Sequence, residues 1–499
     1  MTKLKWHLGF MGVLCCTVYL LPATVAGQTP SGSAQPNHVV AAPRPELPPD
    51  GAAWRAIVGE KFVERTKFTI DVELDPALSV SNTHVNNTID STSNGGQGSG
   101  INAPMVDPGD TGFLLDGLWL FLHRDLKTNL ASVITPYPGP MPTKPDFGFA
   151  VTTSYGRGCQ GARMSGWDTH WFMNEPAASH PTSAAANRFN YFCTPETYLS
   201  GYLPIWQGVS FRAGRWGQGL GLEIPPNQSF TPNFFYSHSY TWEANTRQVF
   251  GFIISANVLR SPKNGYLMAE FGLNNGELTL KSPAKEPMQS FEGALRWRSP
   301  NMATWVDFNI RGGNSNIKDS KGDYEQGTYL LSPRDQMRIH YQFNVIQQFN
   351  KHWSGAIEGN YMTQAGDGKP GTVWMLSPDS KPFGGDHAIS LNGKAVYAFN
   401  KKISLGTRLE TFHDVNGYFL APGDHWTDVH GGHVAKGNFN DFSIGANFSP
   451  IRNMRIRPEY RYDWTSSPVF DHQDSAVVSG AHLPKKYLDS FNMDMLVWF

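Results

Sequence analysis

The chain has 499 residues, of which 40% are hydrophobic, 17% are charged and 13% are aromatic, and its formal net charge is −1. A charge so close to neutral excludes the polybasic character that is typical of nucleic-acid-binding proteins. After the N-terminus, no stretch approaches the roughly 18 to 20 consecutive apolar residues that a membrane helix requires. The composition therefore predicts no nucleic-acid partner and no membrane helix.

Residues 1–27 have the layout of a secretory signal peptide. Lys3 and Lys5 precede an apolar run over residues 8–21, and small residues follow over residues 23–27. Removal of this segment takes away two positive charges and changes the formal net charge from −1 to −3. We therefore expect an exported protein that begins near residue 28.

Residues 28–64 are rich in proline and predict a disordered periplasmic linker, with one short helix over residues 52–63. From residue 65 to residue 499 the pattern changes to apolar and polar residues in alternation, which indicates strands with two chemically different faces. The alternation begins at residues 68–74 and recurs at residues 147–155, 250–258, 265–273, 291–297, 302–310, 337–345, 353–361, 389–399, 403–409, 442–448, 454–464 and 491–499.

The segment MRIRPEYRYDW, residues 454–464, shows this alternation most clearly. Tyr460 and Trp464 share the apolar face, whereas Arg457 and Arg461 share the charged face. A soluble sandwich would turn the apolar face toward a core, and a membrane barrel would turn it toward lipid. Pro458 lacks a backbone donor, so it predicts a bulge or a strand end at this position.

The connections between the predicted strands favour the barrel, because long and short connections alternate. A sandwich has no reason to keep this rhythm, whereas outer-membrane barrels have short periplasmic turns and long external loops. Large aromatic residues near the strand ends also suit a membrane-interface belt. The long connections are residues 312–336, 363–387, 413–439 and 465–485, and the short ones are residues 299–301, 348–352, 400–402 and 449–453.

About fifteen strands are visible, but a closed bacterial barrel is expected to have an even number. A weak strand over residues 187–197 would complete a barrel of about sixteen strands, and about fourteen strands is the alternative. The sequence therefore predicts an all-β, antiparallel transmembrane barrel over residues 65–499. A barrel of this size leaves an aqueous channel unless loops fill it.

Charged residues in mid-strand predict the lining of this channel. Wall salt bridges are the alternative role for the same residues, and their balanced signs argue against strong charge selectivity. The basic set is Arg296, Arg298, Arg311, Arg338, Arg408, Arg455, Arg457 and Arg461, and the acidic set is Glu270, Glu292, Asp307, Glu358, Glu410, Glu459 and Asp463.

Two cysteines remain after export, Cys159 and Cys193. An oxidising compartment permits a disulfide between them, and two free thiols are the alternative. Neither cysteine has the CxxC spacing of a redox or metal site.

Signs of catalysis and metal binding are weak. The motifs HEXXH and GxSxG, the phosphate-binding loop and paired CxxC are absent. Ser237 and His238 could belong to a hydrolase, but local packing is the simpler interpretation. A loop cluster has ligand types suited to a divalent metal, but loop clusters of this kind are more often solvated, and we predict no metal and no cofactor. Its members are Asp424, His425, Asp428, His430 and His433.

Two stretches resemble the OmpL-like family of bacterial outer-membrane beta-barrel porins. They are GVSFRAGRWGQGLGLEIPPNQSFTPNFFYSHSYTW, residues 208–242, and EYRYDW, residues 459–464, which is followed by the terminal strand FNMDMLVWF. Phe499 is similar to the terminal signal that the barrel-assembly machinery recognises. The resemblance implies a pore in the outer membrane, surrounded by lipid, and porin-like barrels are often trimers.

We therefore predict an outer-membrane porin, a passive diffusion channel for small hydrophilic solutes such as sugars, ions or organic anions. A plugged structural or secretion-partner barrel is the main alternative, and an outer-membrane hydrolase is a weaker one. Conductance without partners, a co-purifying protein and substrate turnover would distinguish the three.

Overall fold

The protein is described from a computed structural model, in which the main body belongs to the unit Val39–Phe499. The structure describes residues 51–82, 112–128, 141–156, 158–159, 164, 166–168, 171, 190–217, 221–223, 233–244, 248–277, 290–314, 337–365, 385–417, 419–420, 436–468, 470, 477–478, 481–482 and 485–499. The predicted signal peptide and most of the predicted linker lie outside these residues.

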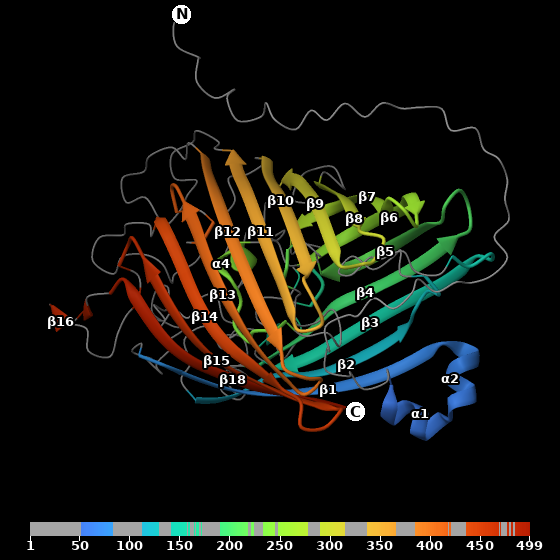
Figure 1. The fold of residues 1–499 in the computed structure, drawn as a ribbon, viewed down its shortest axis with the longest axis horizontal. Coiled ribbons are helices and arrows are strands. Elements are labelled where there is room, and N and C mark those ends of the chain that lie inside the picture. The colour runs from blue at the N-terminus through green and yellow to red at the C-terminus, as the bar shows by residue number, and fades with distance from the viewer. Residues whose placement is uncertain are drawn as a thin grey trace, which may run out of the picture. The chain divides into compact units, whose positions relative to one another are not determined.

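Sixteen antiparallel strands form a closed barrel, which confirms the predicted fold class. Figure 1 shows them side by side around the wall. They are β1 (Phe68–Ser81), β2 (Gly112–Arg124), β3 (Asp146–Gly156), β4 (Tyr191–Leu203), β5 (Val209–Gly217), β6 (Gln248–Ser261), β7 (Gly265–Glu277), β8 (Ser290–Arg298), β9 (Thr304–Asn314), β10 (Met337–Gln348), β11 (Trp353–Ala365), β12 (Gly385–Ala398), β13 (Ile403–Asp414), β14 (Gly437–Phe448), β15 (Met454–Thr465) and β18 (Tyr487–Trp498).

The first and last strands of the wall pair with each other, so the sheet has no free edge. Val80 on β1 lies opposite Phe491 on β18, and the Ser79 hydroxyl donates to the Asn492 side-chain oxygen at 2.9 Å. A separate two-stranded sheet pairs β16 (Val477–Val478) with β17 (Ala481–His482). Closure matters because an open edge would expose unpaired backbone groups to lipid.

In the part of the chain that the structure describes, three short helices accompany the barrel: α1 (Ala52–Val58), α2 (Glu60–Thr66) and α4 (Tyr240–Ala244). Where the sequence predicts one helix, Gly59 separates α1 from α2. The Trp54 indole N–H donates to the Phe68 carbonyl at 3.2 Å, and this contact holds α1 beside the start of β1 (Figure 1). Among the described residues, no helix has the length and apolar character needed to cross a membrane.

The two faces of each strand differ as the alternation predicts. On β15, Arg457 and Arg461 are buried inside, whereas Tyr460 is 42% exposed on the outer face. Large apolar side chains cover the outer face elsewhere, and Ile357 and Leu409 are 57% and 58% exposed. So much exposed apolar surface requires apolar surroundings.

Pro458 lies inside β15 without a bulge, which corrects the prediction of a bulge or a strand end. β15 pairs with β14 at Glu459 and again at Ile456 in one unchanged register, and Pro458 itself lies opposite Met493 on β18. The missing donor of Pro458 therefore interrupts the pairing with β14 locally but does not shift the strand.

The weak strand that the sequence needs to complete sixteen strands is β4. It begins and ends a few residues later than the predicted range of 187–197. The connection between β2 and β3, residues 125–145, is longer than the other connections at its rim. The alternation of long and short connections holds for the rest of the wall.

Candidate functional site

One segment from the connection between β5 and β6 lies inside the barrel. We call residues 233–244, which include α4, the inserted segment. It contacts inward side chains of β10, β12, β13, β14 and β15, and Figure 1 shows α4 within the ring of strands. β5 and β13 are eight positions apart in the order of the sixteen strands, which places them on opposite sides of the barrel. The inserted segment therefore lies inside the barrel against the part of the wall opposite β5.

Basic and amide side chains of the wall hold the carbonyl groups of the inserted segment. The Arg457 guanidinium donates to the Asn233 carbonyl at 2.6 Å, and the Asn447 amide donates to the Phe234 carbonyl at 2.9 Å. Arg408 donates to the Ser237 carbonyl at 2.8 Å. Further along, Arg461 donates to the carbonyl of His238 and Arg338 to that of Ala244. These side-chain donors satisfy backbone groups that have no partner in a strand or helix.

Acidic side chains hold the backbone N–H groups of the same segment. Glu459 accepts from the Ser237 N–H at 2.8 Å. Glu410 accepts from the N–H groups of Tyr240 and Thr241 at 2.6 and 2.8 Å. These two groups belong to the first turn of α4, where helical N–H groups lack partners within the helix. The mixed charges of the wall are therefore the docking surface for an irregular chain segment.

Arg408 is the centre of this docking surface. Its guanidinium lies 3.2 Å from the Glu223 carboxylate, 3.1 Å from that of Asp441 and 3.8 Å from that of Glu459. Lys394 on β12 approaches Glu223 from the other side at 3.1 Å. Burial opposes ionisation of Glu223, but these two cations hold the pKa of its carboxyl well below the ordinary value.

Ser237 and His238 do not form the pair that a hydrolase would need. The Ser237 hydroxyl lies 2.5 Å from the Glu459 carboxylate, and His238 Nδ1 lies 3.2 Å from Glu223. The His238 ring is stacked on Trp242 with 3.7 Å between centroids. Both side chains are buried inside the barrel. Their contacts fit local packing of the inserted segment, as the simpler interpretation of the sequence had it.

Burial of His238 predicts a pH dependence of stability. Loss of hydration lowers the pKa of its imidazole to about 4, from an ordinary value of 6.5, with Glu223 opposing the shift and Arg408 and Lys394 adding to it. The unfolded chain therefore binds more protons than the folded chain between about pH 6.5 and 4. The stabilisation is complete above pH 6.5 and is lost as the pH falls toward 4.

We expect the titration of His238 to lower the free energy of unfolding of the wild type by about 2 kcal/mol between pH 7.5 and 5. His238→Asn retains a donor for Glu223 but does not titrate. The free energy of unfolding of this variant should therefore fall by about 2 kcal/mol less than that of the wild type over the same interval. Urea unfolding in lipid vesicles at the two pH values measures the difference. Equal losses in the two proteins would contradict the prediction.

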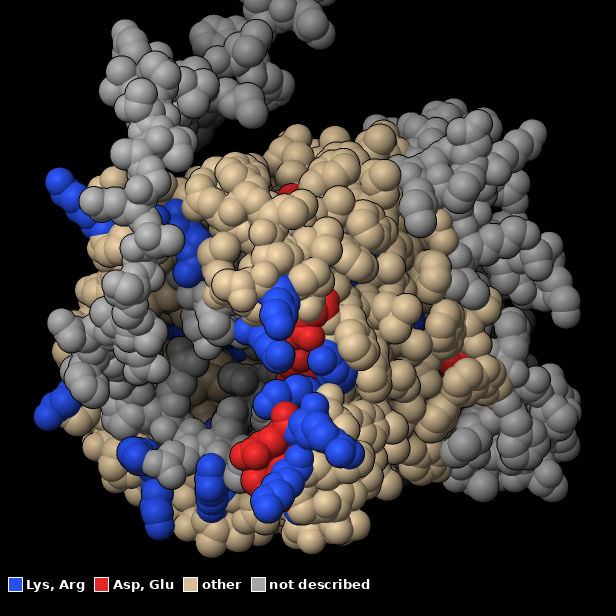
Figure 2. Space-filling view, turned by 90° about the vertical axis from the view of Figure 1, so that its right-hand side faces the viewer, with Lys and Arg blue, Asp and Glu red and all other residues tan. Residues whose placement is uncertain are grey.

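Other predicted charges pair within the opposite part of the wall. Arg296 lies 3.1 Å from Glu270 and 3.4 Å from Asp307, and Arg298 also contacts Asp307. On the face drawn in Figure 2, basic and acidic side chains lie against one another in a patch beside a hollow, and most other atoms are uncharged. The structure therefore brings together most of the predicted basic and acidic residues as neighbours of opposite sign.

The remaining predicted residues also lie on inward positions. Glu292 and Arg311 are opposite each other on β8 and β9. Glu358 accepts from the Leu222 N–H at 2.6 Å, and Asp463 lies 2.7 Å from Arg461. The Arg455 guanidinium lies 5.6 Å from the centre of the Trp498 ring.

An apolar cluster inside the barrel was not predicted. It packs α4 against inward residues near the ends of the strands that lead into the long connections. The alternation of the strands did not reveal this cluster, because its strand residues are apolar side chains on the inward face, which is otherwise polar. The cluster consists of Tyr240, Ala244, Met362, Ala388, Phe412, Phe419, Leu420, Phe439, Phe470 and Leu488. It adds an apolar anchor to the polar contacts of the inserted segment.

The sulfur atoms of Cys159 and Cys193 lie within bonding distance in the structure, across a separation of 34 residues. In the chain-entropy model, closing such a loop stabilises a protein by about 2–4 kcal/mol. We expect Cys193→Ser to lower the free energy of unfolding by this amount under oxidising conditions. The same comparison with reductant present should show little difference between the two proteins.

The loop cluster weighed as a metal site, from Asp424 to His433, lies outside the described residues. Within the ranges that the structure describes, no group of three or more His, Cys, Asp and Glu side chains is arranged to hold a metal ion.

Comparison with known proteins finds a matching family model and several solved outer-membrane proteins of similar structure. OprB of Pseudomonas putida is 11% identical, with a TM-score of 0.48 over 92% of this chain and 100% of that one. The anion-selective porin from Comamonas acidovorans is 10% identical, with a TM-score of 0.45 over 87% and 99%. The outer membrane channel DcaP of Acinetobacter baumannii is 9% identical, with a TM-score of 0.45 over 87% and 97%. A search of the curated proteins gives no match.

The family model described as "Putative beta-barrel porin-2, OmpL-like" matches residues 123–482. This range includes fourteen of the sixteen wall strands in whole or in part, from the end of β2 to β15, together with the inserted segment and its docking surface. The chain therefore belongs to the OmpL-like family of beta-barrel porins, and it is a channel for small solutes in the bacterial outer membrane.

Proposed function

We propose that small hydrophilic solutes, such as sugars, ions or organic anions, diffuse passively past the inserted segment, without catalysis and without a cofactor. The observation that carries this proposal is the position of residues 233–244 inside a sixteen-stranded barrel, where they are docked on the wall opposite β5. Barrels of this strand number enclose water, and an element that lies inside the lumen narrows the path.

We further propose that the inward charged residues of both signs border this path where they are not engaged with the inserted segment. Neighbours of opposite sign cancel much of each other's field, as Arg296 does with Glu270 and Asp307. Net charge should therefore discriminate weakly between small anions and cations. Cleavage of residues 1–27, recognition of the terminal strand by the barrel-assembly machinery and assembly into a homotrimer belong to the same proposal.

The test is single-channel recording of the purified, folded protein in a planar lipid bilayer. We expect stable unitary steps without any added partner, and a reversal potential near zero in a salt gradient. A reversal potential close to that of a perfectly selective pore would contradict the cancelling charges.

A plugged barrel that acts as a structural or secretion partner is the second candidate. The observation that favours it is the deep burial of inward charges, because Arg408, Arg461 and Asp441 are at most 1% exposed. A folded barrel that stays silent in the bilayer and co-purifies with another protein would support this candidate over open diffusion.

A further inference from the structure

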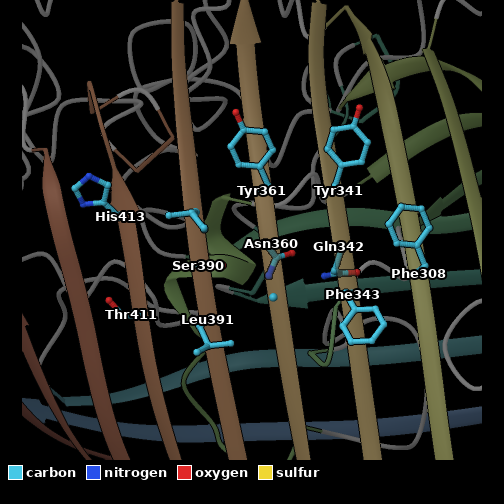
Figure 3. A pocket seen from close by; sticks show the side chains of 12 residues that line it. Phe308, Tyr341, Gln342, Phe343, Asn360, Tyr361, Ser390, Leu391, Thr411 and His413 are labelled. Atoms are coloured by element: carbon cyan, nitrogen blue, oxygen red, sulfur yellow. The ribbon is translucent and has the colours of Figure 1, made fainter. Parts of the chain in front are cut away.

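A hollow of about 570 Å³ lies on the outer wall of the barrel, between β9 and β13. Figure 3 shows it from close by. Inner positions of the same strands, such as Asn360, hydrogen-bond inside the barrel, so the alternation turns Tyr361 outward. The outward residues that line the hollow include Phe308, Tyr341, Phe343, Tyr361, Leu391 and His413.

One glycine, Gly359, lines this hollow, and a second glycine, Gly393, lies on the adjacent strand outside the lining. Gly359 on β11 lies opposite Phe343 on β10 and Leu391 on β12, and Gly393 on β12 lies opposite Ile357 on β11. A Cβ atom added at Gly359 would meet nothing within 4 Å, and one added at Gly393 would meet only a carbonyl oxygen at 3.9 Å. Glycine weakens a strand interior and often marks a place where another molecule approaches.

The hollow is polar at one end and apolar at the other. Tyr341 and Tyr361 lie opposite each other on β10 and β11, with ring centres 6.4 Å apart. In Figure 3 their hydroxyl groups point the same way, toward the end of the wall that leads into the long connections. Ile389 and His413 continue the same level on β12 and β13. Below this level, the outward residues that line the hollow are Phe308, Phe343, Gly359, Leu391 and Thr411.

We propose that this hollow binds one acyl chain of a lipid from the external leaflet, with its polar head beside the Tyr hydroxyls and His413. The polarity of the hollow matches a molecule with a polar head and an apolar chain, in the order that an external leaflet would present them. Phe343 and Tyr361 are 48% and 44% exposed, so the protein itself leaves their rings uncovered. A chain seated between them makes dispersion contacts that a flat wall would not offer.

A second copy of the protein is the other candidate occupant of an outer wall. The hollow spans a few strands and is open along its length, whereas a stable protein interface buries about 800 Å² on each partner. The surrounding medium, by contrast, supplies acyl chains to every part of this wall. The site takes no part in conduction, and its occupancy is independent of the proposed function.

The experiment uses the full chain folded into vesicles that contain phosphatidylethanolamine with a photoactivatable diazirine in one acyl chain. After illumination, mass spectrometry maps the labelled residues. We expect labels to concentrate on the lining residues of β10, β11 and β12. The variant Gly359→Leu places a side chain in the hollow, and labelling of these residues should fall severalfold.

Gly293→Leu is the matched control, because Gly293 lies on an outward position of β8, away from the hollow, where an added Cβ makes only ordinary contacts at 3.5 Å. It should leave the labelling unchanged, and the gel mobility of the unheated barrel checks folding of every variant. Labels spread evenly over the outer wall, or labels that survive filling, would overturn the proposal. Loss of an oligomer in the filled variant, seen by native mass spectrometry, would assign the hollow to a second copy instead.

Discussion

Deletion of residues 233–244, with the chain rejoined by a short Gly-Ser linker, is expected to raise the unitary conductance severalfold. The inserted segment lies inside the barrel against the wall around β13, opposite β5, and so takes up part of the cross-section of the lumen. Its removal leaves a wall of charged side chains facing water, which a wide barrel accommodates. Single-channel recording before and after the deletion measures the effect.

A second variant separates the volume of the inserted segment from its docking. Replacement of residues 233–244 by a Gly-Ser sequence of equal length keeps the chain but removes the contacts with Glu410 and the apolar cluster around Phe412. We expect a conductance above that of the wild type, with larger fluctuations in current. A folded deletion variant that conducts like the wild type would show that the inserted segment does not narrow the path.

The barrel was predictable because strand alternation is a local signal. In β15 each residue faces the opposite side from its neighbour, so the sequence MRIRPEYRYDW already assigns Arg457 to the inside and Tyr460 to the outside. The even strand number followed from closure of the sheet, and it led to a strand that the pattern did not show.

β4 was hard to locate because its alternation is broken. Its pairing with β3 changes register between Thr152 and Ser154, and four successive residues of β4, from Cys193 to Glu196, are buried. A register shift moves side chains to the other face, so the period of two is lost there. The predicted range consequently began and ended several residues too early.

The docking of the inserted segment could not be predicted, since it depends on contacts between distant parts of the chain. Glu223 meets Arg408 across 185 residues, and Ser237 meets Glu459 across 222 residues. Neither the segment nor its partners follow a period that would reveal the pairing. The hollow at Gly359 was equally hidden, because it depends on the register that aligns this glycine with Phe343 and Leu391 on the neighbouring strands.

The strongest expected effect on stability is at Arg408. Arg408→Met preserves most of the side-chain volume but removes the cation that lies beside Glu223, Asp441 and Glu459. Removing one partner of a buried ion pair leaves uncompensated charge and costs about 3–5 kcal/mol. We expect a loss near the lower end of this range, because Lys394 remains beside Glu223. Urea unfolding at pH 7.5 in lipid vesicles measures it.

Two companion variants make this result specific. Lys351→Met removes a cation from an exposed turn and should change stability by no more than about 0.5 kcal/mol. Arg408→Lys keeps the positive charge but lacks the planar guanidinium that contacts the Ser237 carbonyl and three carboxylates together. The free energy of unfolding of this variant should therefore lie between those of the wild type and Arg408→Met. If Arg408→Met were as stable as Lys351→Met, the buried carboxylates would have to be hydrated or protonated. The charged wall would then be accessible to water rather than sealed by the inserted segment.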